Sequence, residues 1–261
     1  MTPLPLLRVE IDGRPADTAS LLHPATAGFG HFTALQVRGG ATRGLALHLE
    51  RLRAATYELW GRELDGARVR ELIRHALGDT YPDASVRVHV YCPEGEPTVM
   101  VTVRGPQRMD PAPQALQSVA YRRPAAHLKH LGGFGQAYYG QRARAAGFDE
   151  ALLVEDDGTV LEGAVTNIGF VDEEGAVVWP QGPSLAGTTM QLIAPRLAAA
   201  GLASRRARVT LDGLGAFRAA FVTNSQGIAP VHRVDTTSFA GDGKLMRRLD
   251  EVYASVPWDT V

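Results

Sequence analysis

Cysteine, long apolar runs and any excess of charge are all scarce in this sequence. The 261 residues include one cysteine, Cys92, so no disulfide can form within the chain, and a cytoplasmic location is expected. No apolar run approaches the roughly 18 residues of a membrane-spanning helix, and the first residues do not resemble a signal peptide. The net charge of −1 gives no reason to expect a nucleic acid or a membrane as partner.

Lysine is the scarcest of the basic residues. Lys129 and Lys244 are the two lysines among 27 basic residues, which leaves 25 arginines. Arginine cannot form a Schiff base, whereas a partly desolvated lysine can. Because a single lysine can equally be an ordinary surface residue, the residues around Lys129 decide between the two interpretations.

Short β-rich segments alternate with helical patterns and predict an α+β fold. In the first half, Leu45, Leu49 and Leu52 share one helical face, as do Val69 and Ile73 in a second pattern. We expect strands at 6–11, 32–37, 85–91, 98–104, 116–121, 151–156, 159–163, 167–171, 176–179 and 219–224. We expect later helices at 136–146, 188–200 (where Pro195 can introduce a kink) and 242–254.

A proline-rich segment marks the predicted domain boundary. Residues 105–114 hold three prolines and a glycine with few large apolar residues, which is typical of a linker. We therefore predict a small N-terminal α/β domain (1–108), a linker (109–115) and a larger C-terminal domain (116–261). An ordinary surface loop inside one domain is the alternative.

Four features of the sequence together fit one kind of cofactor. Lys129 can form a Schiff base with an aldehyde, and Glu162 follows 33 positions later in GTVLEGAVTNIGFV. The segment 184–190, SLAGTTM, places a glycine and two threonines at a helix start, which suits a phosphate. Arg51 lies on a predicted helix and could bind the same phosphate through two hydrogen bonds. A reactive lysine, a carboxylate, a phosphate site and an arginine are together what pyridoxal 5′-phosphate (PLP) requires.

In this order, these segments resemble the fold-type IV PLP enzymes, also called class IV aminotransferases. That family includes branched-chain and D-amino-acid aminotransferases and 4-amino-4-deoxychorismate lyases. The resemblance implies a C-terminal domain with a pseudo-barrel β core, PLP joined to Lys129 as a Schiff base, and a homodimer. It implies that the cofactor is bound by Arg51, Lys129, Glu162, Thr166, Asn167, Gly187, Thr188, Thr189 and Thr223.

The resemblance also indicates where the substrate binds. Phe32 stands where D-amino-acid aminotransferases have a tyrosine, and Arg87 where branched-chain enzymes have an arginine. Asn224 and Ser225 match the turn that receives a substrate carboxylate. Further candidates on the same strands are His31, Thr33, Gln36 and His89. No metal ion is part of the predicted site.

The predicted function is transfer of an amino group between an amino acid or amine and a 2-oxo acid. The alternative is a carbon–oxygen lyase of the 4-amino-4-deoxychorismate type, which would use the same lysine. Gly132 and Gly133 replace an Asn-Tyr pair that the family often has after the lysine, and Met190 replaces an arginine after the phosphate-binding threonines. These departures predict an unusual substrate pocket.

Overall fold

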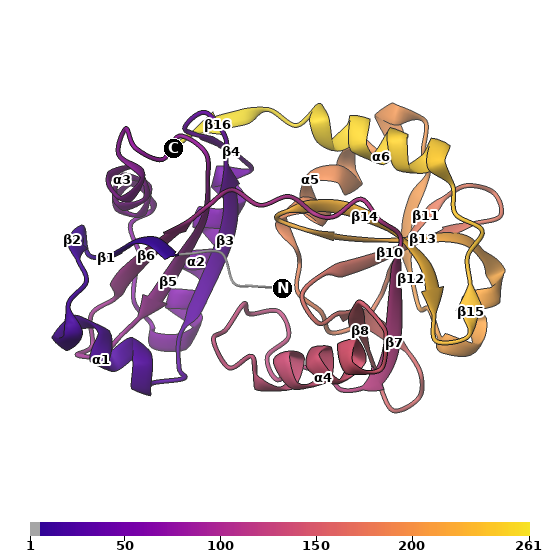
Figure 1. Cartoon of the computed structure of the whole chain (residues 1–261), viewed down its shortest axis with the longest axis horizontal. Coiled ribbons are helices and arrows are strands. Elements are labelled where there is room, and N and C mark those ends of the chain that lie inside the picture. The colour runs from indigo at the N-terminus through magenta and orange to yellow at the C-terminus, as the bar shows by residue number, and fades with distance from the viewer. Residues whose placement is uncertain (1–5) are drawn as a thin grey trace. The chain divides into compact units, whose positions relative to one another are not determined.

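The computed structural model describes residues 6–261, which form two compact units (Figure 1). Unit 1 runs to Arg108 and also contains Leu128–Gly132 and Pro257–Val261. Unit 2 contains Met109–His127 and Gly133–Val256. The predicted C-terminal domain, 116–261, includes Leu128–Gly132 and Pro257–Val261, whereas the structure places these two segments in unit 1. Between residues 6 and 261, no helix is both long enough and apolar enough to cross a membrane.

Unit 1 is built on an antiparallel five-stranded sheet in the order β2-β1-β6-β5-β3. Helices α2 (Leu45–Trp60) and α3 (Gly66–Leu77) contribute to the same hydrophobic core as the alternate residues of β3, β5 and β6. This packing follows from a period of two along each strand and a turn of 3.6 residues along each helix. The strands are β1 (Leu6–Ile11), β2 (Arg14–Pro15), β3 (His31–Val37), β5 (Ala84–Tyr91) and β6 (Thr98–Arg104).

The last residues of the sequence, Pro257–Val261, belong to unit 1. Strand β16 (Trp258–Thr260) pairs with β4 (Ala41–Arg43). Helix α2 begins after Gly44, which offers no side-chain cap, and the carboxylate of Asp259 accepts a hydrogen bond from the N–H of Leu45 at 3.0 Å. A distant residue thus satisfies one of the free N–H groups at the start of this helix.

Helix α1 (Thr18–Thr26) is one element that the sequence analysis did not predict. None of its residues is buried, so it has no apolar periodicity to detect. Its local signal is a reciprocal cap, in which Asp17 accepts from the N–H of Ser20 at 2.8 Å and the Ser20 hydroxyl accepts from the N–H of Asp17 at 2.9 Å. This arrangement is typical of a helix start.

Unit 2 is a nine-stranded sheet that curls into a half-barrel (Figure 1). One core includes Leu116, Phe170 and Val222. A second core joins β10, β11 and β13 to α5 (Thr188–Ile193) and α6 (Gly243–Ala254). The predicted α+β fold with a barrel-like β core is confirmed. The strands are β7 (Gln114–Ala120), β8 (Glu150–Val154), β9 (Val160–Gly163), β10 (Asn167–Asp172), β11 (Val177–Pro180), β12 (Ser204–Ala207), β13 (Phe217–Asn224), β14 (Gly227–Val234) and β15 (Thr237–Ser238).

The helix predicted at 188–200 is wrong in its second half. Helix α5 ends at Ile193, and two short 3-10 turns follow, Ala194–Arg196 and Ala198–Ala200. Pro195 has no N–H to donate and its ring disfavours a continuing α-helix, which accounts for the early end. The remaining helices of unit 2 are α4 (Phe134–Ala145) and the 3-10 helix η3 (Leu211–Ala216).

Candidate active site

Lys129 is fixed to the edge of the sheet in unit 1. The N–H of Phe32 donates to the carbonyl of Lys129, and the N–H of Leu131 donates to the carbonyl of Gly30, both at 2.9 Å. The segment that carries the lysine therefore continues the sheet beside β3. The ammonium nitrogen of Lys129 lies 4.9 Å from the centre of the Phe32 ring, within the range of a cation–π contact.

Phe32 is also the centre of a group of substrate candidates on one face of the sheet. Its ring stacks on His89 with centroids 5.6 Å apart, and the guanidinium of Arg87 lies 5.7 Å from its centre. The register pairs Phe32 with His89 and Ala34 with Arg87, so these side chains share the face opposite the apolar core. The structure thus brings Phe32, Arg87 and Lys129 together.

The other strand candidates are engaged elsewhere in unit 1. His31 pairs with the Thr56 hydroxyl at 2.9 Å, and Thr33 pairs with His48 at 2.7 Å, so both face α2. The side-chain amide of Gln36 donates to Ser85 at 3.0 Å and accepts from the N–H of Gln107 at 3.0 Å. These contacts give His31, Thr33 and Gln36 structural roles.

His48 lies on α2 within reach of the charges of both Arg51 and Lys129. Burial lowers the pKa of Arg51 to about 10, so its charge is retained at neutral pH. Burial, followed by the charges of Arg51 and Lys129, lowers the pKa of His48 to about 3. His48 is therefore neutral and supports this region through Thr33. Sequence reasoning missed His48, although it stands three residues before Arg51 in the same HLERL segment.

Glu162 lies on β9 in unit 2 and is buried with an arginine. One carboxylate oxygen accepts from Nη1 of Arg123 at 3.0 Å, and the other accepts from the N–H of Leu185 at 3.1 Å. Arg123 also donates to the carbonyl of Ala126 at 3.0 Å. Arg123 and Glu162 are each only 4% exposed, so neither charge is solvated by bulk water. Arg123 was not predicted, because nothing in the sequence separates it from its neighbour Arg122.

Asn167 and Gly187 fit closely together in unit 2. The side-chain amide of Asn167 donates to the carbonyl of Leu185 at 2.7 Å. A Cβ at position 187 would lie 1.8 Å from the side-chain oxygen of Asn167, so only glycine fits there. Thr166 donates its hydroxyl hydrogen to Glu150 at 3.0 Å. Asn167 thus contacts the segment just before α5, whereas Thr166 is joined to β8.

Two buried threonine hydroxyls test whether a phosphate fits this region. Thr188 and Thr223 are 6% and 0% exposed, and neither hydroxyl has a hydrogen-bond partner among the described residues. An unsatisfied buried hydroxyl costs about 1–3 kcal/mol. A phosphate oxygen would accept from both, so the residues fit the phosphate end of PLP. Thr189 instead donates to the carbonyl of Asn224 at 2.7 Å and fastens α5 to the end of β13.

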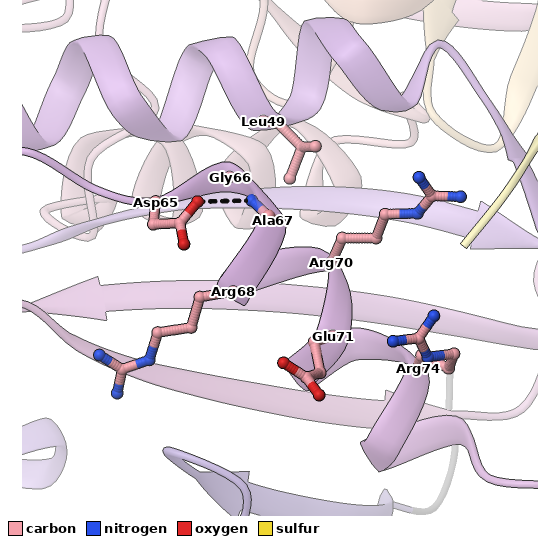
Figure 2. Close-up of a pocket in the computed structure, with 8 residues that line it drawn as sticks. All are labelled: Leu49, Asp65, Gly66, Ala67, Arg68, Arg70, Glu71 and Arg74. Atoms are coloured by element: carbon pink, nitrogen blue, oxygen red, sulfur yellow. Dashed lines mark hydrogen bonds between the residues drawn. The ribbon is translucent and has the colours of Figure 1, made fainter.

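A separate hollow of about 700 Å³ lies beside α2 and α3 (Figure 2). Asp65 caps α3 there by accepting from the N–H of Ala67 at 2.9 Å. Arg68 binds Asp12 at 2.8 Å, and Arg70 donates to the carbonyl of Thr260 at 2.7 Å. None of the predicted site residues lines this hollow, and two of its arginines, Arg68 and Arg70, already have structural partners.

A large part of the chain matches the model of a known protein family. Residues 30–234 match the model described as amino-transferase class IV. Because the match covers more than half of the chain, the protein belongs to the class IV aminotransferase family, and the predicted resemblance is confirmed. No curated protein sequence matches closely enough to be counted as a relative.

Solved structures with the same fold support the architecture. A hypothetical aminotransferase from Mycobacterium tuberculosis, in its PLP-bound form, is 20% identical over 95% of this chain and 98% of its own, with a TM-score of 0.82. The T.th. branched-chain amino acid aminotransferase with pyridoxamine 5′-phosphate is 22% identical over 97% and 94%, with a TM-score of 0.84. A fold IV-transaminase from Curtobacterium pusillum is 24% identical over 92% and 93%, with a TM-score of 0.80.

Proposed function

We propose that this class IV aminotransferase holds PLP on Lys129 and moves an amino group between an amino acid or amine and a 2-oxo acid. The observation that carries the proposal is the placement of Lys129, one of two lysines in the chain, on the edge of β3 beside Phe32. The PLP-bound aminotransferase from Mycobacterium tuberculosis and the T.th. branched-chain aminotransferase with pyridoxamine 5′-phosphate both have this fold. PLP is the cofactor of this chain. The family description favours an aminotransferase over the lyase alternative.

The proposed roles of the residues follow from their chemistry. PLP, when bound, supplies an electron sink for the Cα of the substrate. The amine of Lys129 takes the proton from Cα and returns it at C4′ of the cofactor, as general base and then general acid. The carboxylate of Glu162 keeps a proton on the ring nitrogen, and Arg123 with the Leu185 N–H orients that carboxylate.

Other residues bind the cofactor and the substrate in this proposal. The phosphate is held by Arg51, Gly187, Thr188, Thr189 and Thr223, and Thr166 with Asn167 supports the ring. The substrate is contacted by Phe32 and Arg87, and its carboxylate by Asn224 and Ser225. The division into domains 1–108 and 116–261 with a linker at 109–115 is proposed as well. A cytoplasmic homodimer is our further proposal, supported by the lone Cys92 and by the resemblance.

Incubation of the PLP-loaded enzyme with a single amino donor tests the proposed reaction. An aminotransferase completes half of its reaction without an acceptor, so the visible band of bound PLP should give way to the shorter-wavelength band of pyridoxamine phosphate. Addition of a 2-oxo acid should restore the first band. A lyase would release its product and keep the original spectrum, and a protein that binds no PLP would contradict the whole proposal.

Replacement of Arg51 by alanine should weaken cofactor binding more than it slows the chemistry. A charge-assisted phosphate contact stabilises the ground and transition states alike, so we expect a loss of about 1.5–3 kcal/mol in PLP affinity. Excess PLP should recover most of the activity.

Equilibrium titration of the Arg51→Ala apoprotein with PLP measures this effect. Arg53→Ala is the matched control, because Arg53 is on the same helix but pairs with Glu50 at 2.7 Å on the surface. Unchanged PLP affinity together with lost activity would instead assign Arg51 to the substrate.

A further inference from the structure

Glu150 is a buried carboxylate to which the proposed mechanism gives no role. It is the first residue of β8 and only 6% exposed. One of its oxygens accepts from the N–H of Val165 at 2.6 Å, and the other accepts from the hydroxyl of Thr166 at 3.0 Å. Both partners donate to it, and an ionised carboxylate is the form that accepts two such bonds.

The carboxylate of Glu150 packs directly against the turn that follows Glu162. A Cβ at Gly163 would lie 2.8 Å from Oε1 of Glu150 and 2.1 Å from the hydroxyl oxygen of Thr166. The N–H of Gly163 also donates to the carbonyl of Thr166 at 2.9 Å and closes the turn. No side chain fits at position 163 between these groups, so Glu150 and Thr166 pack directly on the backbone of the turn.

This turn connects two residues of the proposed cofactor site. Glu162 precedes it and accepts from the N–H of Leu185, and Asn167 follows it and donates to the carbonyl of Leu185. Any change in the turn therefore moves both ends of this hydrogen-bonded arrangement.

We propose that Glu150 is a positioning residue, which holds the 163–166 turn so that Glu162 and Asn167 keep the orientation that cofactor binding requires. The inference rests on the proposed function, in which these two residues serve PLP.

The charge of Glu150 gives this role a specific signature. Burial raises the pKa of Glu150 to about 7; the bonds from Val165 and Thr166 and the charge of Arg144 on α4 oppose the shift, and Glu162 on β9 adds to it. Glu150 therefore exchanges its proton near neutral pH. The protonated carboxyl loses the charge that strengthens its two contacts, so it should hold the turn less firmly below pH 7.

The experiment compares PLP dissociation constants of wild-type and Glu150→Gln apoproteins between pH 6 and 8.5. Glutamine keeps the shape but carries no charge at any pH. We expect the variant to bind PLP about tenfold more weakly at pH 8.5, where wild-type Glu150 is ionised. The ratio of the variant's PLP dissociation constant to that of the wild type should approach one at pH 6, where both side chains are neutral. Effects of pH on PLP itself cancel in this ratio.

Asp172→Asn is the matched control, because Asp172 is also buried, at the other end of β10, and binds the N–H of Ala176 and Arg205. It should change the thermal stability but give a ratio that does not vary with pH. A ratio for Glu150→Gln that stays constant across the pH range would overturn the proposal. If the wild-type protein itself bound no PLP, the proposed function would fail instead.

A second variant covers the case in which Glu150→Gln does not fold. Thr166→Val removes one of the two donors to Glu150, so the ionised form loses support and its pKa should rise further. The midpoint of the pH dependence of PLP binding should move upward relative to wild type. An unmoved midpoint would also overturn the proposal.

Discussion

Replacement of Lys129 by alanine should abolish amino transfer and the yellow colour of the PLP-loaded protein. The variant lacks the amine that would join PLP and carry the proton, so turnover should fall by several powers of ten, each about 1.4 kcal/mol of barrier. The fold should survive, because the substitution keeps the backbone carbonyl of residue 129, which accepts the hydrogen bond from Phe32 on β3.

Lys244→Ala provides the comparison, since Lys244 is the second lysine and lies exposed on α6. Borohydride reduction followed by peptide mass spectrometry should find the cofactor on Lys129 in both the wild type and Lys244→Ala. If the Lys129→Ala protein stayed yellow after dialysis and kept near-normal turnover, the assignment of this lysine would be wrong.

Replacement of Glu162 by glutamine should remove most of the turnover while the protein still binds PLP. An amide is neutral and cannot keep the ring nitrogen protonated, so the transition state loses electrostatic support. The buried Arg123 also loses its anionic partner, and we expect the free energy of unfolding to fall by up to about 3 kcal/mol. Both effects exceed the roughly 0.5 kcal/mol expected for a surface acid.

Half-reaction rates with a good amino donor, together with chemical denaturation, measure the two effects of Glu162→Gln. Glu155→Gln is a suitable control, since Glu155 forms only a partly exposed ion pair with Arg122 at 3.6 Å. Wild-type-like rates in Glu162→Gln would exclude a role for Glu162 at the cofactor, even if Lys129 passed its own test.

Residues with intrinsic chemistry could be predicted from the sequence, whereas residues that act through tertiary contacts could not. Lys129 could be proposed because lysine is rare in this chain, and Glu162 because it follows 33 positions later in a segment that resembles the family's. Arg123, Glu150 and His48 have no distinguishing local pattern, and their importance depends on which buried group they meet. A sequence pattern can indicate burial, but it does not identify the partner.

The same distinction applies to the fold. Strands β1 and β6 have the predicted bounds. In β6 the alternating Val99, Val101 and Val103 are buried and mark the core face, whereas in β1 the buried residue is Glu10. The edge position of residues 128–132 was not predicted, since it depends on backbone hydrogen bonds that any residue can make. Helix α1 was missed because it buries no side chain.

The cap that Asp259 gives to α2 also affects the order of events during synthesis. Arg51 leaves the ribosome about 200 residues before Asp259, which at roughly 5–20 residues per second is a delay of about 10–40 s. Throughout that interval the helix that carries Arg51 lacks the cap, and β4 lacks its partner strand. A nascent chain therefore acquires its complete arginine-bearing helix only after the whole of unit 2 has been translated.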